Sequence, residues 1–255
     1  KPGIGNLNFD SRFILEYNVN PITNYLTGHK FTDPSGGYTY GDTFDRPEGS
    51  LRAAADQWID GSWNESVGGH ISTWDTSEVA DFSDTFRNQS TFNEDLSHWN
   101  VSNATDIRYM FSECASFNQD IGDWDVSNVK DMNGVLHNCA AFNQNLNKWN
   151  TYNVIDMDNI FIGATSFNQP LNDWQTDSCT TMIAMFYNAP VFNQPLNPPP
   201  DGAWDTRQVR RMNAMFSGAS SFNQNISNWN TTSLEISSSM YSNCPIQDSY
   251  KAPNT

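Results

Sequence analysis

Residues 121–144 read IGDWDVSNVKDMNGVLHNCAAFNQ, and a similar stretch returns about every 25 residues. The closing phrase has counterparts along most of the chain, namely Phe92-Asn93-Glu94, Phe117-Asn118-Gln119, Phe142-Asn143-Gln144, Phe167-Asn168-Gln169, Phe192-Asn193-Gln194 and, five residues late, Phe222-Asn223-Gln224. Tryptophan keeps the same spacing at Trp74, Trp99, Trp124, Trp149, Trp174, Trp204 and Trp229. A fixed period of this length predicts one structural unit per repeat, which buries its apolar face by stacking on its neighbours.

Alignment of the repeats on their tryptophans gives apolar columns that predict the inward positions. The column three residues before the tryptophan holds Leu96, Ile121, Leu146, Leu171 and Ile226. The column five residues after it holds Val79, Ala104, Val129, Val154, Cys179, Val209 and Leu234. The spacing of Ile121, Trp124 and Val126 is typical of a short parallel strand, and Asp131-Met132-x-x-Val135-Leu136 predicts one or two helical turns. The expected fold is a solenoid, a leucine-rich-repeat-like stack of coils, each with a short parallel β-strand and a short helix or turn.

The repeat W-[DN]-[VT]-S-x-V-x-D-M-x-x-M-F-x-x-A-x-x-F-N-Q resembles that of the BspA-type leucine-rich-repeat surface proteins. The segment Trp124-Asp125-Val126-Ser127-Asn128-Val129-Lys130-Asp131-Met132 carries this pattern most closely, and the likeness extends over roughly residues 48–245. The resemblance implies a surface-displayed or extracellular solenoid used in adhesion, protein–protein interaction or assembly. It implies no catalytic motif.

Composition and charge fit a thin core and exclude some partners. Only 37% of the 255 residues are hydrophobic, while 16 Phe and 9 Trp supply large apolar side chains. A net charge of −16 argues against nucleic acid, whose phosphates would be repelled. No apolar run is long enough for membrane insertion. Proteins, further copies of the chain or glycans remain as expected partners.

The chain divides into four parts by pattern. Residues 1–47 lack the repeat and predict an irregular N-terminal arm, which either packs along the first coils or reaches a neighbouring subunit. Residues 48–72 predict an N-terminal cap, because Leu51, Ala54, Ala55, Trp58 and Ile59 form a helical apolar stripe. Residues 73–245 form the repeat solenoid of about seven coils, with an insertion at 198–202, and residues 246–255 are a C-terminal tail.

An aspartate stands at the same position in four consecutive repeats: Asp81, Asp106, Asp131 and Asp156. Stacked at roughly 5 Å per coil, these carboxylates could form a calcium ladder. Each also precedes an apolar residue that opens a predicted helical turn, where a side-chain oxygen caps free backbone N–H groups. We favour capping, with calcium as the alternative, and expect no other cofactor or metal.

The residues directly after the tryptophans are the candidate binding face: Asp75, Asn100, Asp125, Asn150, Gln175, Asp205 and Asn230. Neighbouring residues of a strand point to opposite faces, so this column faces solvent if the tryptophans face the core. Solenoids commonly bind partners through such a face. The alternative is that an exposed strand face is polar in any case. The Asn of each Phe-Asn-Gln phrase predicts a stacked amide ladder that holds a turn.

Cysteines and sequons bear on the cellular compartment. Cys114 and Cys139 occupy equivalent positions in consecutive coils, roughly 5 Å apart, which permits a disulfide and would indicate an oxidising compartment. Glycosylation sequons begin at Asn64, Asn88, Asn100, Asn103, Asn225 and Asn230. They are weak indicators of a secreted glycoprotein, since Asn, Ser and Thr are abundant here.

Two function classes remain, and an enzyme is not expected. The first is a structural or assembly component of an extracellular surface, such as a cell coat, an appendage or a virion layer. The second is a ligand-binding or adhesion module that uses the exposed strand face. A hydrolase would need two carboxylates about 5 to 10 Å apart in a groove, for which Asp123 and Asp125 are the nearest candidates. No nucleophilic triad, phosphate-binding glycine loop or dinucleotide fingerprint is present.

Overall fold

The computed structural model describes residues 30–32 and 51–255. The predicted arm over residues 1–47 therefore lies outside the described residues, except for strand β1, Lys30–Thr32. The elements that follow are helix α1 at Leu51–Asp60, helix α2 at Glu65–Gly68, a 3₁₀ helix at Ile71–Thr73 and strand β2 at Asp75–Glu78. A second 3₁₀ helix, Asp248–Tyr250, lies near the C-terminus. All regular elements thus lie toward the two ends of the described chain.

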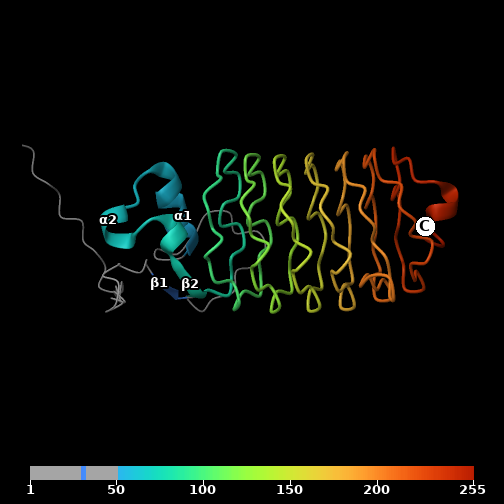
Figure 1. Ribbon diagram of the computed structural model, residues 1–255, viewed down its shortest axis with the longest axis horizontal. Helices are drawn as coiled ribbons and strands as arrows, with labels where there is room; N and C mark the ends of the chain where they lie inside the picture. Colours follow the sequence, from blue (N-terminus) through green and yellow to red (C-terminus); the bar gives the residue numbers. More distant parts are fainter. Residues whose placement is uncertain (1–29, 33–50) are drawn as a thin grey trace, which may run out of the picture.

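Between these ends the chain forms successive coils stacked along the long axis of the molecule (Figure 1). Each coil pairs with the next through one isolated parallel bridge at the position of Asp131. The bridges run Asp81 to Asp106, Asp106 to Asp131, Asp131 to Asp156, Asp156 to Thr181, Thr181 to Arg211 and Arg211 to Ile236. The strand predicted around Trp124 is absent, since residues 124–126 form no strand. Pairing occurs instead seven residues after each tryptophan.

The segment that follows each bridge is the main site of pairing between coils, and we call it the ledge, defined as residues 131–138 and their equivalents. In the ledge, alternate N–H groups donate to the next coil: Met132 to the Asp156 carbonyl at 3.1 Å and Gly134 to the Asp158 carbonyl at 2.9 Å. The N–H of Val135, which follows Gly134, donates to the Met132 carbonyl, three residues earlier. Residues 133–138 form turns and not an α-helix, because an α-helix would use these N–H groups within the segment.

Two left-handed residues, four apart, give the ledge its shape. In one coil they are Gly134, with φ of 61°, and Asn138, with φ of 56°. The other coils repeat the pair at Asp84 and Asn88, Tyr109 and Glu113, Asn159 and Gly163, Ala184 and Asn188, Ala214 and Gly218, and Ser239 and Asn243. Left-handed backbone interrupts any helix and turns alternate N–H groups toward the neighbouring coil.

The core is a set of aromatic columns that run through the stack. Phe117 and Phe142 stack with ring centroids 5.8 Å apart and an interplanar angle of 7°, and Trp149 and Trp174 stack at 6.1 Å and 6°. The inward columns predicted from the sequence are buried, apart from Leu234 in the last coil, which is half-buried. Equivalent rings thus pack on one another, as the stacking argument predicts.

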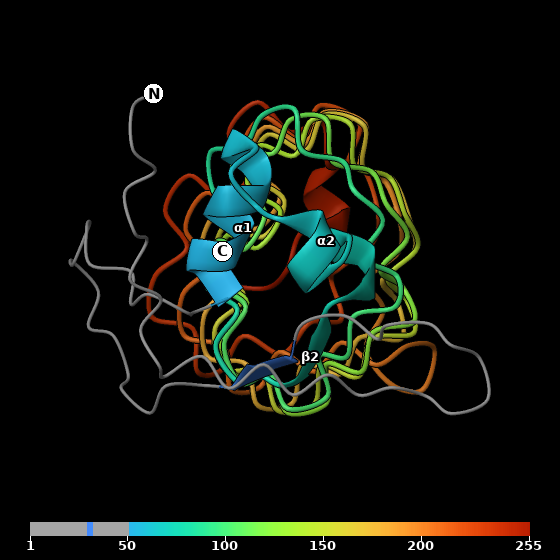
Figure 2. The same ribbon diagram turned by 90° about the vertical axis from the view of Figure 1, so that its left-hand side faces the viewer.

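Helices α1 and α2 lie at the N-terminal end of the stack (Figure 2). The stripe of α1 packs as predicted, with Leu51, Ala54 and Ala55 buried. The Arg52 guanidinium donates to the Asp81 carboxylate at 3.1 Å and to the Ser83 hydroxyl, which fixes α1 on the first ledge. Strand β1 pairs in parallel with β2, so the N-terminal segment contributes one short strand to the first coil.

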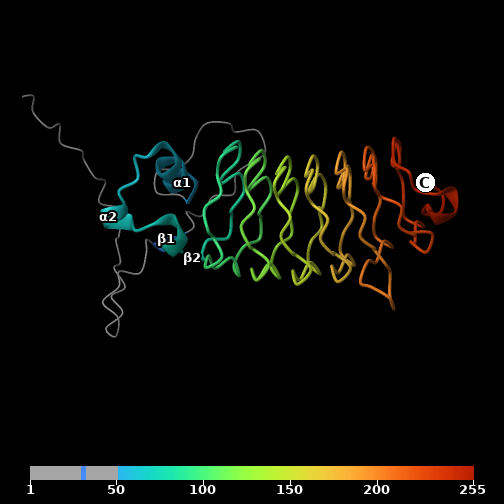
Figure 3. The same ribbon diagram turned by 45° about the horizontal axis from the view of Figure 1, so that its top comes forward.

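The tail over residues 246–255 packs on the last coil. Ile246 and Ala252 are buried, and the Tyr250 carbonyl accepts a hydrogen bond of 2.9 Å from the N–H of Ile226. The Pro253 carbonyl accepts a bond of 2.8 Å from the Thr231 hydroxyl. The insertion at 198–202, orange in Figure 3, loops out from the line of turns. The coil-to-coil pairing continues on both sides of it.

Candidate functional site

The predicted binding column is used mainly to hold turns. The Asp125 carboxylate accepts a hydrogen bond of 3.0 Å from the N–H of Ser127, two residues later. The same bond is formed by Asp75, Asn100, Asn150, Asp205 and Asn230. These are Asx turns, in which a side-chain oxygen accepts a hydrogen bond from the backbone N–H two residues later. The hydrogen bonds from Ser127 lower the pKa of the Asp125 carboxyl.

Gln175 is the exception in this column. Its Oε1 atom is buried and has no hydrogen-bond partner among the described residues. Asn100, Asp125, Asn150 and Asn230 are exposed, so the column does reach solvent. Its members lie in separate coils and do not converge on a common point.

The carboxylates of Asp123 and Asp125 have different hydrogen-bond partners. The Lys148 ammonium donates to the Asp123 carboxylate at 2.7 Å, and both side chains are exposed. Asp125 is held by Ser127 in its own turn. Hydrolysis with two opposed carboxylates requires a shared groove, and these two side chains have separate partners on an open surface.

The aspartates of the ledge likewise accept hydrogen bonds from backbone N–H groups of their own coil. The Oδ1 atom of Asp131 accepts from the N–H of Asn133 at 2.9 Å, and Asp81, Asp106 and Asp156 make the equivalent bond to Ser83, Arg108 and Asp158. Among the described residues, no group of three or more His, Cys, Asp or Glu side chains is placed to hold a metal ion. The oxygens of this column already hold backbone N–H groups, as the capping prediction expects, and the calcium alternative stays a prediction.

Cations and burial shape the electrostatics of this column. The Arg108 guanidinium lies 3.0 Å from the Asp106 carboxylate and 3.8 Å from that of Asp131. Burial nevertheless raises the pKa of Asp106 to about 6 and also raises the pKa of Asp131. Removal from water disfavours the charged form more than the neighbouring arginine favours it.

Asp158, which was not among the predicted site residues, also has a carboxyl pKa raised by burial. Its Oδ1 atom accepts hydrogen bonds from the Thr181 hydroxyl at 2.5 Å and from the N–H of Ile183 at 2.6 Å. Burial raises the pKa of Asp158 to about 6. A sequence signal was present, since Asp158 is the one acid in a column otherwise filled by Ser83, Arg108, Asn133, Ile183, Asn213 and Ser238.

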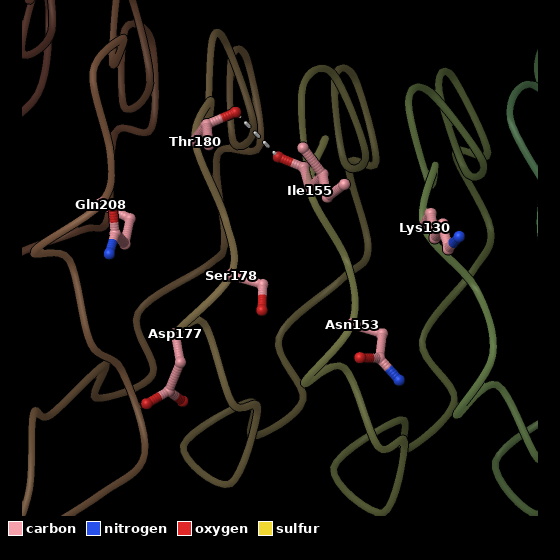
Figure 4. A pocket seen from close by; sticks show the side chains of 7 residues that line it. All are labelled: Lys130, Asn153, Ile155, Asp177, Ser178, Thr180 and Gln208. Carbon is pink, nitrogen blue, oxygen red and sulfur yellow. Dashed lines mark hydrogen bonds between the residues drawn. The ribbon is translucent and has the colours of Figure 1, made fainter.

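A shallow depression of about 450 Å³ lies on one side of the stack (Figure 4). Its lining comes from neighbouring coils: Lys130, Asn153, Ile155, Asp177, Ser178, Thr180 and Gln208. The Thr180 hydroxyl donates to the Ile155 carbonyl at 3.3 Å, and the Ile155 side chain is 46% exposed. None of the predicted binding-face residues lines this depression. It combines one apolar side chain with a cation, an anion and several amide or hydroxyl groups.

Comparison with known families decides the relationship of the chain. Residues 62–137, 120–198 and 201–250 match the family described as Mycoplasma protein of unknown function, DUF285. The chain belongs to the DUF285 family. The second and third matches are separated by residues 199 and 200, which lie in the proline-rich insertion. No curated protein matches the chain, and no solved structure does.

The cysteines of this DUF285 chain are free thiols, so the predicted disulfide between Cys114 and Cys139 was wrong. The Cys114 thiol donates to the Phe86 carbonyl at 2.9 Å, and the Cys139 thiol donates to the Phe111 carbonyl at 3.0 Å. Equivalent side chains in a regular stack point the same way, so each sulfur faces the preceding coil's backbone. Burial raises the pKa of Cys114 to about 12, which keeps this thiol protonated.

The sequons of the DUF285 repeats follow from turn structure. Asn225 accepts hydrogen bonds from the N–H and the hydroxyl of Ser227, and Asn230 does the same with Thr232. Asn64 and Asn100 also accept from the N–H two residues later. The Asn103 amide instead donates to the Ser77 carbonyl at 2.6 Å. Asn88 is exposed in a left-handed conformation. An Asx turn with Ser or Thr at its third position reproduces the sequon without a glycan.

The amide ladder predicted for the Phe-Asn-Gln phrases is confirmed. The Asn118 side chain accepts a bond of 2.9 Å from the N–H of Asn143, and the Gln144 amide donates to the Asn118 carbonyl at 2.9 Å.

Among residues 30–32 and 51–255, no helix has the length and apolar character needed to cross a membrane.

Proposed function

We propose that this protein is a non-enzymatic structural or assembly component of an extracellular surface. The observation that carries the proposal is that side chains of the polar columns accept hydrogen bonds from backbone N–H groups of the stack. Asp125 and Asp131 each hold a backbone N–H of their own coil, and Asn118 holds one of the next coil. Side chains that hold backbone N–H groups suit a protein whose role depends on its own shape.

We further propose that the stack is a leucine-rich-repeat-like solenoid of the BspA type. The parallel bridges between equivalent residues and the continuous aromatic columns support this class. The ledge departs from the strand-and-helix coil that the class implies. Surface display rests on the resemblance and on the acidic, polar composition. The free thiols give the extracellular assignment no additional support.

The molar mass in solution tests the assembly role. Light scattering would compare the full chain with a variant lacking residues 1–47 and a matched variant lacking residues 1–29, which keeps β1 paired with β2. The assembly role predicts a defined oligomer or filament for the full chain and a monomer for the longer deletion, with circular dichroism showing that both variants are folded. If the full chain is monomeric at every concentration, self-assembly through this segment is refuted.

A second candidate function, ligand binding or adhesion, is favoured by the depression around Ile155. Its mixture of an apolar surface with Asp177, Asn153 and Thr180 suits a glycan or a polar peptide side chain. An array of glycans and matrix proteins, probed with the full chain and with Ile155→Ser, tests it. Val191→Ser is the matched control, because Val191 is 41% exposed but does not line the depression. Binding that is lost in both variants, or in neither, contradicts this role.

A further inference from the structure

The ledge of the last coil ends in a row of unpaired hydrogen-bond donors. In the preceding coil the N–H groups of Met212, Ala214, Phe216 and Gly218 donate to the carbonyls of Ile236, Ser238, Met240 and Ser242 at 2.8 to 2.9 Å. The equivalent donors of the last coil belong to Ser237, Ser239, Tyr241 and Asn243. These four N–H groups have no acceptor in the part of the chain that the structure describes. We call residues 236–243 the donor edge.

The donor edge keeps the backbone shape of an interior ledge. Ser239 has φ of 59° and Asn243 has φ of 57°, which match the left-handed pair of every other coil. No folding step is therefore needed before another segment pairs with it. Ser237 stands in the column that holds Met132, Met157, Met182 and Met212, and Ser238, Ser239 and Ser242 are small and exposed. Of the four donor residues, Ser239 and Asn243 are exposed, and Ser237 and Tyr241 are half-buried.

The donor edge cannot pair with itself in a second copy. A twofold-related copy presents the same surface, so it would bring N–H groups against N–H groups and form no hydrogen bonds. Head-to-tail pairing would need the matching side of the first coil, where α1 is fixed by Arg52 and where Ser83 and Thr85 are buried. The two copies therefore offer no accessible acceptor row to each other.

There is also no room for a complete additional coil at this end of the stack. The tail already occupies the neighbouring part of the last coil, where Tyr250 accepts from Ile226 and Pro253 accepts from Thr231. Only the ledge side of the coil is free. A protein segment that pairs here would therefore be a single one that supplies a row of backbone carbonyls.

We propose that the donor edge binds a peptide segment of another protein, which adopts the ledge conformation and is added in parallel as one more ledge. Four N–H groups at alternate residues would donate to four carbonyls of the peptide, as in other cases of β-augmentation. The peptide must reach the left-handed conformation at two positions four residues apart, which Gly and Asn adopt most easily. Ile236, 46% exposed at the start of the edge, adds an apolar contact.

A synthetic peptide with the sequence of residues 128–138, NVKDMNGVLHN, is the probe, because it carries Gly134 and Asn138 at the two left-handed positions. The control peptide carries Val at both positions and keeps the length and charge. Amide hydrogen exchange of the full-length protein would be followed by NMR with each peptide. Binding predicts slowing by about tenfold or more at Ser237, Ser239, Tyr241 and Asn243. Ser242 should not change, since its N–H already donates to Ser239.

Substitutions in the donor edge itself provide a second test of the proposal. Ser237→Pro removes one donor and should weaken peptide binding several-fold, whereas Ser242→Ala keeps all four donors and should bind as the wild type does. The proposal is overturned if the Gly-Asn peptide gives no protection at millimolar concentration, or if the valine peptide protects equally. It is also overturned if the four amides become protected with protein concentration alone, which would make a second copy the occupant. The peptide comparison decides even if Ser237→Pro fails to fold.

Discussion

The indole N–H of Trp149 donates a hydrogen bond of 2.9 Å to the carbonyl of Ile121, one coil and three residues earlier. The same bond joins Trp99 to Ile71, Trp124 to Leu96, Trp174 to Leu146, Trp204 to Leu171 and Trp229 to Leu196. Each of these six tryptophans therefore contributes an apolar ring to its own coil and a hydrogen bond to the coil before it. The repeat uses Trp, and not Phe, at this position because only the indole supplies a donor.

Trp149→Phe should lower the free energy of unfolding by roughly 1 to 3 kcal/mol, because the buried Ile121 carbonyl loses its partner. Urea denaturation followed by circular dichroism measures this change. Tyr152→Phe, at an exposed position in the same coil, is the control and should change stability by less than about 0.5 kcal/mol. Equal effects from the two substitutions would contradict the role of the indole bond.

Gly134→Ala should destabilise the protein by more than Gly61→Ala. Both glycines are left-handed, with φ of 61° and 77°, so both substitutions carry a backbone cost of roughly 1 kcal/mol. A Cβ at Gly134 would also lie 2.4 Å from the Tyr109 ring, whereas a Cβ at Gly61 has no atom within 4 Å. The difference between the two variants in urea unfolding isolates the packing of one ledge on the next. If the variants lose the same stability, the contact with Tyr109 is not a close one.

Asn143→Ala should cost about 0.5 to 1.5 kcal/mol in spite of its exposure, because Asn143 accepts from the N–H of Asn168 at 3.0 Å. Asn145→Ala is a useful comparison, since its oxygen accepts from Asn147 within the same coil. Loss of the Asn143 bond should speed the hydrogen exchange of the Asn168 amide, and loss of the Asn145 bond should not. An Asn168 amide that exchanges equally fast in both variants would argue against the inter-coil ladder.

Asp158→Asn should change the pH dependence of stability. Burial raises the pKa of Asp158 from 3.8 to about 6, so the native state binds a proton more tightly than the unfolded chain. This carboxyl therefore costs stability as the pH rises from about 4 through 6, and the cost is complete above that range. Asparagine keeps an oxygen for Thr181 and Ile183 without the charge. The variant should be more stable than the wild type at pH 8, by up to about 3 kcal/mol, with the difference vanishing below about pH 4.

Unfolding measured between pH 4 and 8 for both proteins gives this difference directly. Asp125→Asn is the control with the opposite sign, because hydrogen bonds from Ser127 lower the pKa of Asp125. That carboxylate contributes stability above its unfolded pKa and loses it as the pH falls. An Asp158→Asn variant with the same pH slope as the wild type would show that Asp158 is ionised as easily in the native state as in the unfolded chain.

All four cysteines should react with a thiol reagent once the chain is unfolded without reductant, because Cys114, Cys139, Cys179 and Cys244 are free. In the native protein the buried Cys114, Cys139 and Cys179 should react far more slowly than half-buried Cys244. Titration with a chromogenic disulfide reagent measures both. A count of two in the unfolded chain would restore the disulfide between Cys114 and Cys139.

The sequence predicted the inward columns well, because equivalent residues in stacked coils share one environment. Phe117, Trp124 and Leu146 are buried where their period places them. The ledge was missed because Met132, Val135 and Leu136 have helical spacing, whereas Asn133, Gly134 and Asn138 decide the backbone. Left-handed residues at Gly134 and Asn138 were the available signal, but Tyr109 and Ala184 occupy the same positions without favouring that conformation.

The candidate sites were less predictable, for a different physical reason. The repeat pattern aligns residues along the stack, whereas the depression forms between columns, from Lys130 and Thr180 of one and Asn153 and Gln208 of another. The cysteine prediction used distance alone. It lacked the direction of the side chains, which point both thiols at the preceding coil's carbonyls.

The hydrogen bonds between ledges run from coil to coil, along the long axis of the molecule. A pulling force applied at the two ends would act on every coil interface in series, so each interface would bear the full tension. Such a stack yields at its weakest interface and lengthens by releasing one 25-residue coil at a time. Under mechanical stress the protein would therefore behave as an extensible tether and would dissipate energy in steps.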